Sequence, residues 1–178
     1  SYKPKILDLS DIDYEAIDIL KKETLFDNLT IYYQDMFLSY TIEKKYDLII
    51  CMFSIIQQYV TDINELRKIT ENVISNLNPG GCLVFEYIDT KISKKIYSNS
   101  EPFALYEEES TLVTILSTYY NDKTKINYRG YIENKRINYD VELYNLKTKD
   151  LKDLFGDKKI KIISLDENDR RNLIAIYN

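Results

Sequence analysis

The chain has 178 residues, 44% of them hydrophobic, a composition that excludes a disordered polypeptide and suffices for one domain with a core. Its formal net charge of −5 argues against a general binder of nucleic-acid backbones, because such binding needs clustered cations. No apolar run approaches the roughly 20 residues that cross a bilayer, and no signal peptide precedes the fold, so we expect a cytoplasmic protein with no membrane partner.

The chain contains no histidine and two cysteines, Cys51 and Cys82. Histidine is the commonest general base and metal ligand, so its absence narrows the available chemistry. Without a cluster of cysteine and histidine, we expect no zinc or iron site. Both cysteines fall in predicted core strands, which favours free buried thiols in a reducing compartment over a disulfide.

The first predicted elements are two strands with a helix between them. The strands are Lys5–Leu9 (KILDL) and Leu29–Tyr33 (LTIYY). The helix, Tyr14–Lys22, has apolar residues on one face, two lysines in its last turn and Asp13 as its expected N-cap. This order begins the alternation of strands and helices that is typical of an α/β protein.

The most informative stretch contains two apolar strands, Leu48–Phe53 and Cys82–Tyr87. An amphipathic helix, Ile63–Asn76, lies between them and is expected to stop at the NPGG turn. Two fully apolar strands joined by a helix predict neighbouring parallel strands in a sheet covered on both faces. Ligands of such sheets bind at the carboxyl ends of the strands, so we expect function at Met52–Gln58 and Glu86–Asp89.

The second half of the chain changes character. Three strands follow one another through short turns, without a crossover: Thr111–Tyr120, Ile126–Ile132 and Ile137–Leu143. A short helix, Thr148–Phe155, and a closing hairpin of Lys159–Ser164 with Asn172–Tyr177 come last. The whole predicts an α/β fold with a mostly parallel Rossmann-like sheet, helices on both faces, an antiparallel C-terminal hairpin and a β-meander.

Four segments carry a resemblance to a known family: DIDYEAIDILKK (11–22), YYQDMF (32–37), YDLIICMFSIIQQY (46–59) and ISNLNPGGCLVFEY (74–87). In this order they resemble the second strand, the adenine-binding turn, the fourth strand and the fifth strand of class I S-adenosylmethionine-dependent methyltransferases. The meander and LYNLKTKDLKDLF (143–155) are similar to the lid and last helix of the small-molecule members. The resemblance implies one domain over residues 1–178, with 111–143 as a lid or a dimerisation insertion.

The resemblance assigns cofactor contacts to the ends of these segments. Asp11 is expected to accept hydrogen bonds from the ribose hydroxyls, with Asp8 as the alternative if the strand register differs. A helix-start carboxylate favoured by the helix dipole is the other interpretation of Asp11. Asp35 is expected to accept a hydrogen bond from the adenine amino group, or else to be a solvated turn residue. The remaining cofactor contacts are assigned to Ile12, Met36, Met52 and Phe53.

The acceptor is expected where the strand of Leu48–Phe53 opens onto the next helix. Ser54 and Gln57 are expected to wall the methyl-transfer site with Phe53, and Tyr59 is a candidate substrate contact; ordinary loop or core roles are the alternatives. Methyl transfer from a sulfonium depends mainly on near-attack positioning in a dry pocket. Because the chain lacks histidine, an amine acceptor, which needs no base, is slightly favoured over a base supplied by Tyr, Asp or Glu.

One feature departs from the family: the glycine-rich loop after the first strand has no counterpart, because no glycine precedes Gly80. That loop lets the backbone approach the cofactor closely. Three explanations are open. In the first, an internal segment is missing, which would leave Ser10 and Asp11 without a peptide bond. In the second, Lys5–Leu9 is already the second strand and the chain lacks its N-terminal part. In the third, a natural deletion has removed cofactor binding.

The sequence therefore predicts an enzyme that transfers a methyl group from S-adenosylmethionine to a small-molecule acceptor. The alternative is a non-catalytic methyltransferase-like domain that binds a partner, which the missing glycine loop favours. An RNA methyltransferase is the third hypothesis, and the acidic composition disfavours it.

Overall fold

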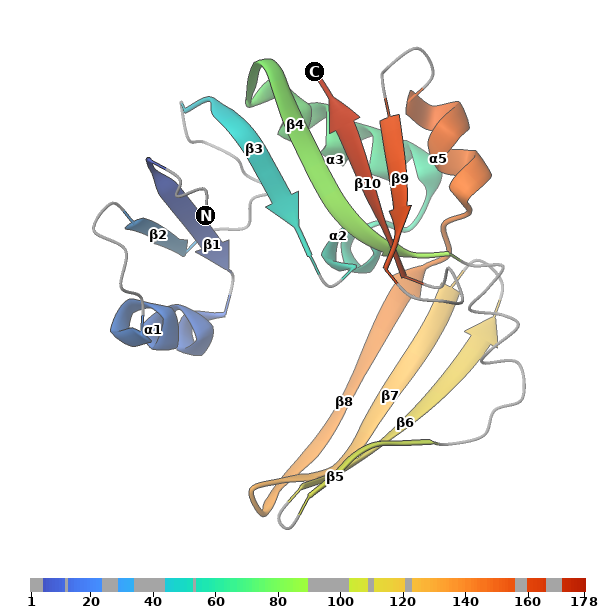
Figure 1. The fold of residues 1–178 in the computed structure, drawn as a ribbon. Coiled ribbons are helices and arrows are strands. Elements are labelled where there is room, and N and C mark those ends of the chain that lie inside the picture. Colours follow the sequence, from blue (N-terminus) through green and yellow to red (C-terminus); the bar gives the residue numbers. More distant parts are fainter. Residues whose placement is uncertain are drawn as a thin grey trace. The chain divides into compact units, whose positions relative to one another are not determined.

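The computed structural model describes residues 5–11, 13–23, 29–33, 44–52, 54–89, 103–108, 111–120, 123–155, 160–165 and 171–178. The chain divides into two compact units, residues 1–44 and 45–178, and each is described by itself (Figure 1). The assignment of one domain to the whole chain stays a prediction.

The first unit is a strand–helix–strand crossover. Strand β1 (Leu7–Asp11) pairs in parallel with β2 (Leu29–Tyr33), and helix α1 (Tyr14–Glu23) joins them. The Asp13 carboxylate accepts a hydrogen bond from the Glu15 backbone N–H at 2.8 Å, which confirms the predicted N-cap. These elements agree with the sequence prediction to within two residues at each end.

Strand β1 is continuous across Ser10 and Asp11, which pair with Tyr32 and Tyr33 of β2. The expectation of a missing segment between these two residues is therefore wrong, because consecutive ladder positions require a bonded chain. The strand also leads through one helix into its parallel neighbour. This connection is the one required if Lys5–Leu9 is the second strand of the fold.

The second unit contains a mixed four-stranded sheet in the order β3-β4-β10-β9. Strand β3 (Tyr46–Cys51) runs parallel to β4 (Leu77–Ile88), as predicted from their apolar sequences. Strand β10 (Arg171–Tyr177) is antiparallel to both β4 and β9 (Ile160–Ser164), so the predicted closing hairpin is confirmed. Strand β4 begins before the predicted Cys82, and the Pro-Gly-Gly segment lies inside it rather than in a turn.

Three helices of the second unit are described: α2 (Ile55–Tyr59), α3 (Ile63–Ser75) and α5 (Thr148–Phe155). The carboxylate of Asp62 caps α3 by accepting hydrogen bonds from two backbone N–H groups, at 2.6 and 3.0 Å. Helix α3 lies along one face of the sheet in Figure 1. The fully buried side chains of the unit are Ile56, Leu66, Leu83, Phe85, Tyr87, Leu146, Leu151, Ile174 and Ile176.

On β3, the opposite face of this sheet is apolar and exposed. Leu48 and Ile50 of β3 are 52% and 57% exposed, although their sequence reads as a strand buried on both faces. Helices on both faces were predicted, but the described part of this unit shows them on one face. Cys51 and Cys82 are free thiols as predicted, partly buried, and burial raises the pKa of Cys51 to about 12.

The third sheet is an antiparallel meander in the order β5-β6-β7-β8. It consists of β5 (Phe103–Glu108), β6 (Thr111–Tyr120), β7 (Lys123–Ile132) and β8 (Lys135–Tyr144). Glu133 and Asn134, at φ 46° and 64°, form the predicted two-residue hairpin turn between β7 and β8. The prediction of a mostly parallel sheet is wrong. Outside the meander sheet, two of the four pairings between the described strands are parallel, and the other two, those of β10 with β4 and with β9, are antiparallel.

Candidate functional site

The carboxyl edge of the first unit carries one of the predicted cofactor residues. Asp11 ends β1 directly opposite Tyr33, the last residue of β2. One oxygen of the Asp11 carboxylate accepts a hydrogen bond from the Asp13 backbone N–H at 2.9 Å and so shapes the turn into α1. Asp35 follows β2 by two residues in the sequence. Asp35, Ile12 and Met36 lie outside the described residues.

Asp8 occupies a different environment from Asp11. The two residues are three apart on one strand, so their side chains point to opposite faces of the sheet. The side chain of Asp8 is 6% exposed and forms an ion pair with Lys44 at 3.0 Å. Lys44 also donates a hydrogen bond to the Tyr32 hydroxyl at 2.9 Å, and hydrogen bonds to Tyr32 and Asp8 raise the pKa of Lys44. The Asp8 carboxylate is therefore held by Lys44 within this unit.

In the second unit, the ends of β3 and β4 lie at the same edge of the sheet, since Cys51 pairs with Phe85. Met52 follows β3 and is partly exposed at this edge. Ser54 has a left-handed backbone at φ 54°, uncommon for a residue with a side chain, and it turns the chain sharply into α2. Phe53, between them, lies outside the described residues. The predicted opening of this strand onto a helix is therefore present.

Gln57 of α2 forms a buried polar joint between two sheets. Its Nε2 donates hydrogen bonds to the backbone carbonyls of Ile88, at 3.1 Å, and Tyr144, at 2.9 Å. Its Oε1 accepts a hydrogen bond from the Ile88 backbone N–H at 2.7 Å. The residue is 2% exposed. The amide thus connects α2 to the end of β4 and to the end of β8, and both ends of the side chain are occupied by backbone groups.

A second joint fixes the start of α5 beside the end of β4. One Asp89 oxygen accepts hydrogen bonds from the Thr148 backbone N–H at 3.0 Å and from its hydroxyl at 2.7 Å. The Tyr87 hydroxyl lies 2.9 Å from the same Thr148 hydroxyl. Burial raises the pKa of Tyr87. Together with Gln57, these contacts determine how the chain passes between β4, the meander sheet and α5.

A cavity of about 260 Å³ lies between the end of β4, helix α2 and one face of the meander sheet. Its lining residues are Ser54, Gln58, Ile88, Ile126, Tyr128, Tyr139, Val141 and Leu143. The residues from β7 and β8 face it as cross-strand pairs, because Ile126 pairs with Val141 and Tyr128 with Tyr139.

The predicted acceptor residues divide between this cavity and the joint. Ser54 lines the cavity, whereas Gln57 is engaged in the joint and its neighbour Gln58 lines the cavity instead. Tyr59 is partly buried and is not among the lining residues. Sequence analysis missed Tyr128 and Tyr139. The alternation of side chains along the two predicted strands could have placed them on the same face as Ile126 and Val141.

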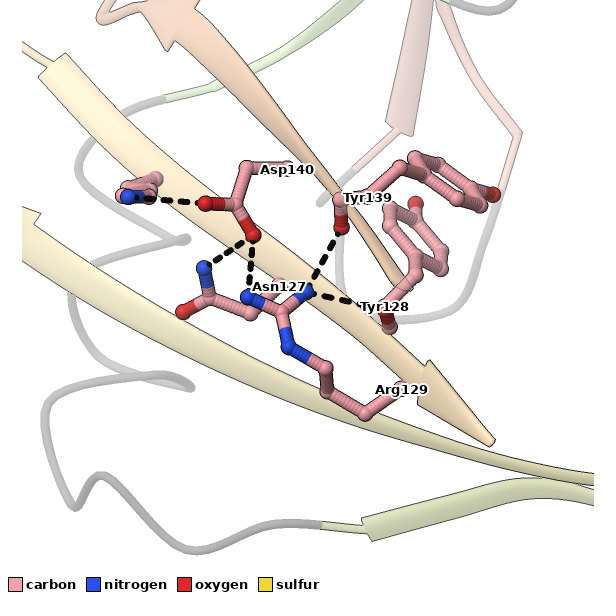
Figure 2. Close-up of polar contacts among 6 residues, drawn as sticks. Asn127, Tyr128, Arg129, Tyr139 and Asp140 are labelled. Carbon is pink, nitrogen blue, oxygen red and sulfur yellow. Dashed lines mark hydrogen bonds and ion pairs between the residues drawn. The ribbon is translucent and has the colours of Figure 1, made fainter. Parts of the chain in front are cut away.

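Figure 2 shows the polar network on the other face of β7 and β8. The Asp140 carboxylate contacts Lys125 at 2.9 Å, Asn127 at 2.7 Å and Arg129 at 2.6 Å. Hydrogen bonds from Lys125, Asn127 and Arg129 hold the pKa of Asp140 well below its usual range. Arg129 also donates to the backbone carbonyls of Tyr128 and Tyr139, both at 2.9 Å. The network thus ties together the two strands that carry the cavity tyrosines.

In the described part of the chain, no three Cys, Asp or Glu side chains gather as a metal site would require. Nor does any helix in that part have the length and apolarity needed to span a membrane.

Neither a family model nor a curated protein matches the sequence. Solved structures do match. An S-adenosylmethionine-dependent methyltransferase from Clostridium acetobutylicum is 17% identical, with a TM-score of 0.75 over 97% of this chain and 82% of that one. The CcbJ methyltransferase from Streptomyces caelestis is 10% identical, with a TM-score of 0.77 over 96% and 82%. The sugar N-methyltransferase KedS8 from Streptoalloteichus is 14% identical, with a TM-score of 0.69 over 97% and 79%. At these identities the likeness establishes the fold.

Proposed function

We propose that this chain, which has the fold of S-adenosylmethionine-dependent methyltransferases, binds S-adenosylmethionine and transfers its methyl group to a small-molecule acceptor. The observation that carries the proposal is the extent of the likeness. Nearly the whole chain, 96–97%, aligns with proteins whose names state that they are methyltransferases. The solved neighbours also include a glycopeptide N-methyltransferase complexed with S-adenosyl-L-homocysteine.

The cofactor contacts proposed are Asp11, Ile12, Asp35, Met36, Met52 and Phe53. Asp11 is preferred to Asp8 for the ribose because it ends its strand at the carboxyl edge, where ligands of such sheets bind. The hydrogen bond from the Asp13 backbone N–H holds one oxygen of the Asp11 carboxylate and so orients the other. Asp8, by contrast, is buried against Lys44.

The acceptor site proposed is the cavity of the second unit, with the meander as its lid. Among the described residues that line it, Ser54, Gln58, Tyr128 and Tyr139 carry neutral polar groups, and none is a carboxylate or a lysine. A hydroxyl acceptor would need a base there, whereas an amine needs only its lone pair. This lining supports an amine acceptor, with the residues acting by positioning and by excluding water.

Replacing Asp11 by Ala is expected to weaken binding of S-adenosylmethionine and S-adenosylhomocysteine. Hydrogen bonds to a charged acceptor contribute about 1.5–3 kcal/mol, so the affinity should fall by about one to two decades. Calorimetric titration of the full chain measures this directly. The matched variant Asp8→Asn keeps the size of the side chain and should retain wild-type affinity, because Asp8 lies on the opposite face of β1.

The same titration tests the alternative function. That alternative is a non-catalytic domain that binds a partner. If the folded wild-type chain gives no heat with either ligand, the partner-binding alternative stands and methyl transfer is excluded. If Asp8→Asn loses affinity and Asp11→Ala keeps it, the ribose contact belongs to Asp8.

A further inference from the structure

Two tyrosine rings form one wall of the cavity. Tyr128 and Tyr139 occupy paired positions on β7 and β8, and their rings are stacked with centroids 4.6 Å apart and an interplanar angle of 12° (Figure 2). Tyr139 is 51% exposed, so much of its ring surface is accessible. Stacked rings at this separation offer an aromatic surface on which a further planar group can pack.

A side chain on the other face of β7 and β8 contacts the backbone of both stacked tyrosines. Arg129 binds the carbonyl oxygens of both tyrosines at 2.9 Å, and Asp140 holds the Arg129 guanidinium at 2.6 Å. The strands that carry the rings are therefore locked together before any ligand arrives. Preorganisation of this kind lowers the conformational entropy that is lost on binding.

The rest of the lining determines the charge that a ligand can carry. Four aliphatic side chains, Ile88, Ile126, Val141 and Leu143, surround the rings. The polar lining groups, those of Ser54, Gln58 and the tyrosines, are uncharged at neutral pH. An anionic ligand would lose hydration in the cavity without a positive charge on the described lining to compensate.

We propose that the cavity binds a flat aromatic ring without negative charge that stacks on Tyr139, with Ser54 and Gln58 lining the space beside it. The inference rests on the proposed function only in taking the ring to be part of the methyl acceptor. It adds to that function the chemical class of the acceptor body.

The test uses three small probes and the full chain: 2-phenylethanol, its saturated counterpart 2-cyclohexylethanol, and the anion phenylacetate. Saturation-transfer NMR titrations give their affinities. Stacking contributes a preference of about 2- to 12-fold for the aromatic alcohol over the saturated one. Tyr139→Leu keeps an apolar side chain and should remove this preference, whereas Tyr139→Phe should retain it. Phenylacetate should bind more weakly than 2-phenylethanol.

A matched control is available on the same strand pair. Tyr131 is 52% exposed but lies on the other face of β7, so Tyr131→Leu should leave all three affinities unchanged. Equal binding of the aromatic and saturated alcohols overturns the proposal. Tighter binding of phenylacetate than of 2-phenylethanol also overturns it, as does a Tyr131→Leu effect as large as that of Tyr139→Leu. Ring binding is measured without cofactor. If the chain binds the ring but not S-adenosylmethionine, this inference stands and the proposed function is wrong. If it binds S-adenosylmethionine but shows no preference for the ring, the proposed function stands and this inference is wrong.

Discussion

A Gln57→Met variant is expected to lose about 3–5 kcal/mol of the free energy of unfolding. The Gln57 amide makes three hydrogen bonds to backbone groups of Ile88 and Tyr144 while it is 2% exposed. Methionine has a similar volume, so the packing is conserved and the hydrogen bonds are lost. A buried polar group that loses its partner costs about 1–3 kcal/mol, and three groups are affected.

Urea unfolding followed by circular dichroism measures this loss as a lower midpoint at an unchanged slope. Gln58→Met is the control, since Gln58 is the exposed neighbour in the same helix, and a surface substitution usually changes stability by less than about 0.5 kcal/mol. Equal losses in the two variants would show that the joint does not stabilise the unit.

The position of Gln57 also shows why the acceptor site was only partly predictable. Neighbouring residues of a helix point about 100° apart, so the roles of Gln57 and Gln58 depend on where the helix begins. Helix α2 spans only Ile55–Tyr59, too short for apolar periodicity to reveal it. The sequence analysis therefore named Gln57, whereas the adjacent Gln58 is the glutamine that lines the cavity.

Elements with strong local signals were predicted closely. Strand β6 and helix α5 have the predicted bounds, and α3 differs from its prediction by one residue at its end. In α3 the Asp62 cap and the apolar face both predict a helix over the same residues, and the apolar face is the one that packs in the core. Strand partners are a different problem, because pairing joins residues far apart in the sequence. The number of antiparallel pairs, and strand β5, were therefore missed.

The choice between Asp8 and Asp11 as the proposed ribose contact depends on a long-range interaction of the same kind. Asp8 and Asp11 both fit an acidic residue near the end of a strand, and the sequence leaves the register open. What separates them is Lys44, which is 36 residues from Asp8 and forms the ion pair with it. Because no local pattern predicts such a pair, Asp8 and Asp11 could be distinguished only by their positions in the folded unit.

Gly130→Ala is expected to cost about 2–5 kcal/mol, combining overpacking of about 1–3 kcal/mol with backbone strain of similar size. Gly130 has φ +153°, and a Cβ there would lie 1.9 Å from the carbonyl oxygen of Leu112 and 2.9 Å from its carbonyl carbon. Both atoms belong to the backbone of β6, so they cannot move without separating β6 from β7. Urea unfolding would show the loss.

Gly80→Ala separates the two contributions. Gly80 has φ +78° and open space around the position of a Cβ, so only backbone strain of about 1–2 kcal/mol is expected there. A larger loss at Gly130 would show that the close approach of Leu112 requires glycine; equal losses would mean that backbone conformation alone is responsible. Gly130 lies two residues from Tyr128 on β7. Separation of β6 from β7 should therefore also weaken binding of 2-phenylethanol, whereas Gly80→Ala, outside the meander sheet, should leave that binding unchanged.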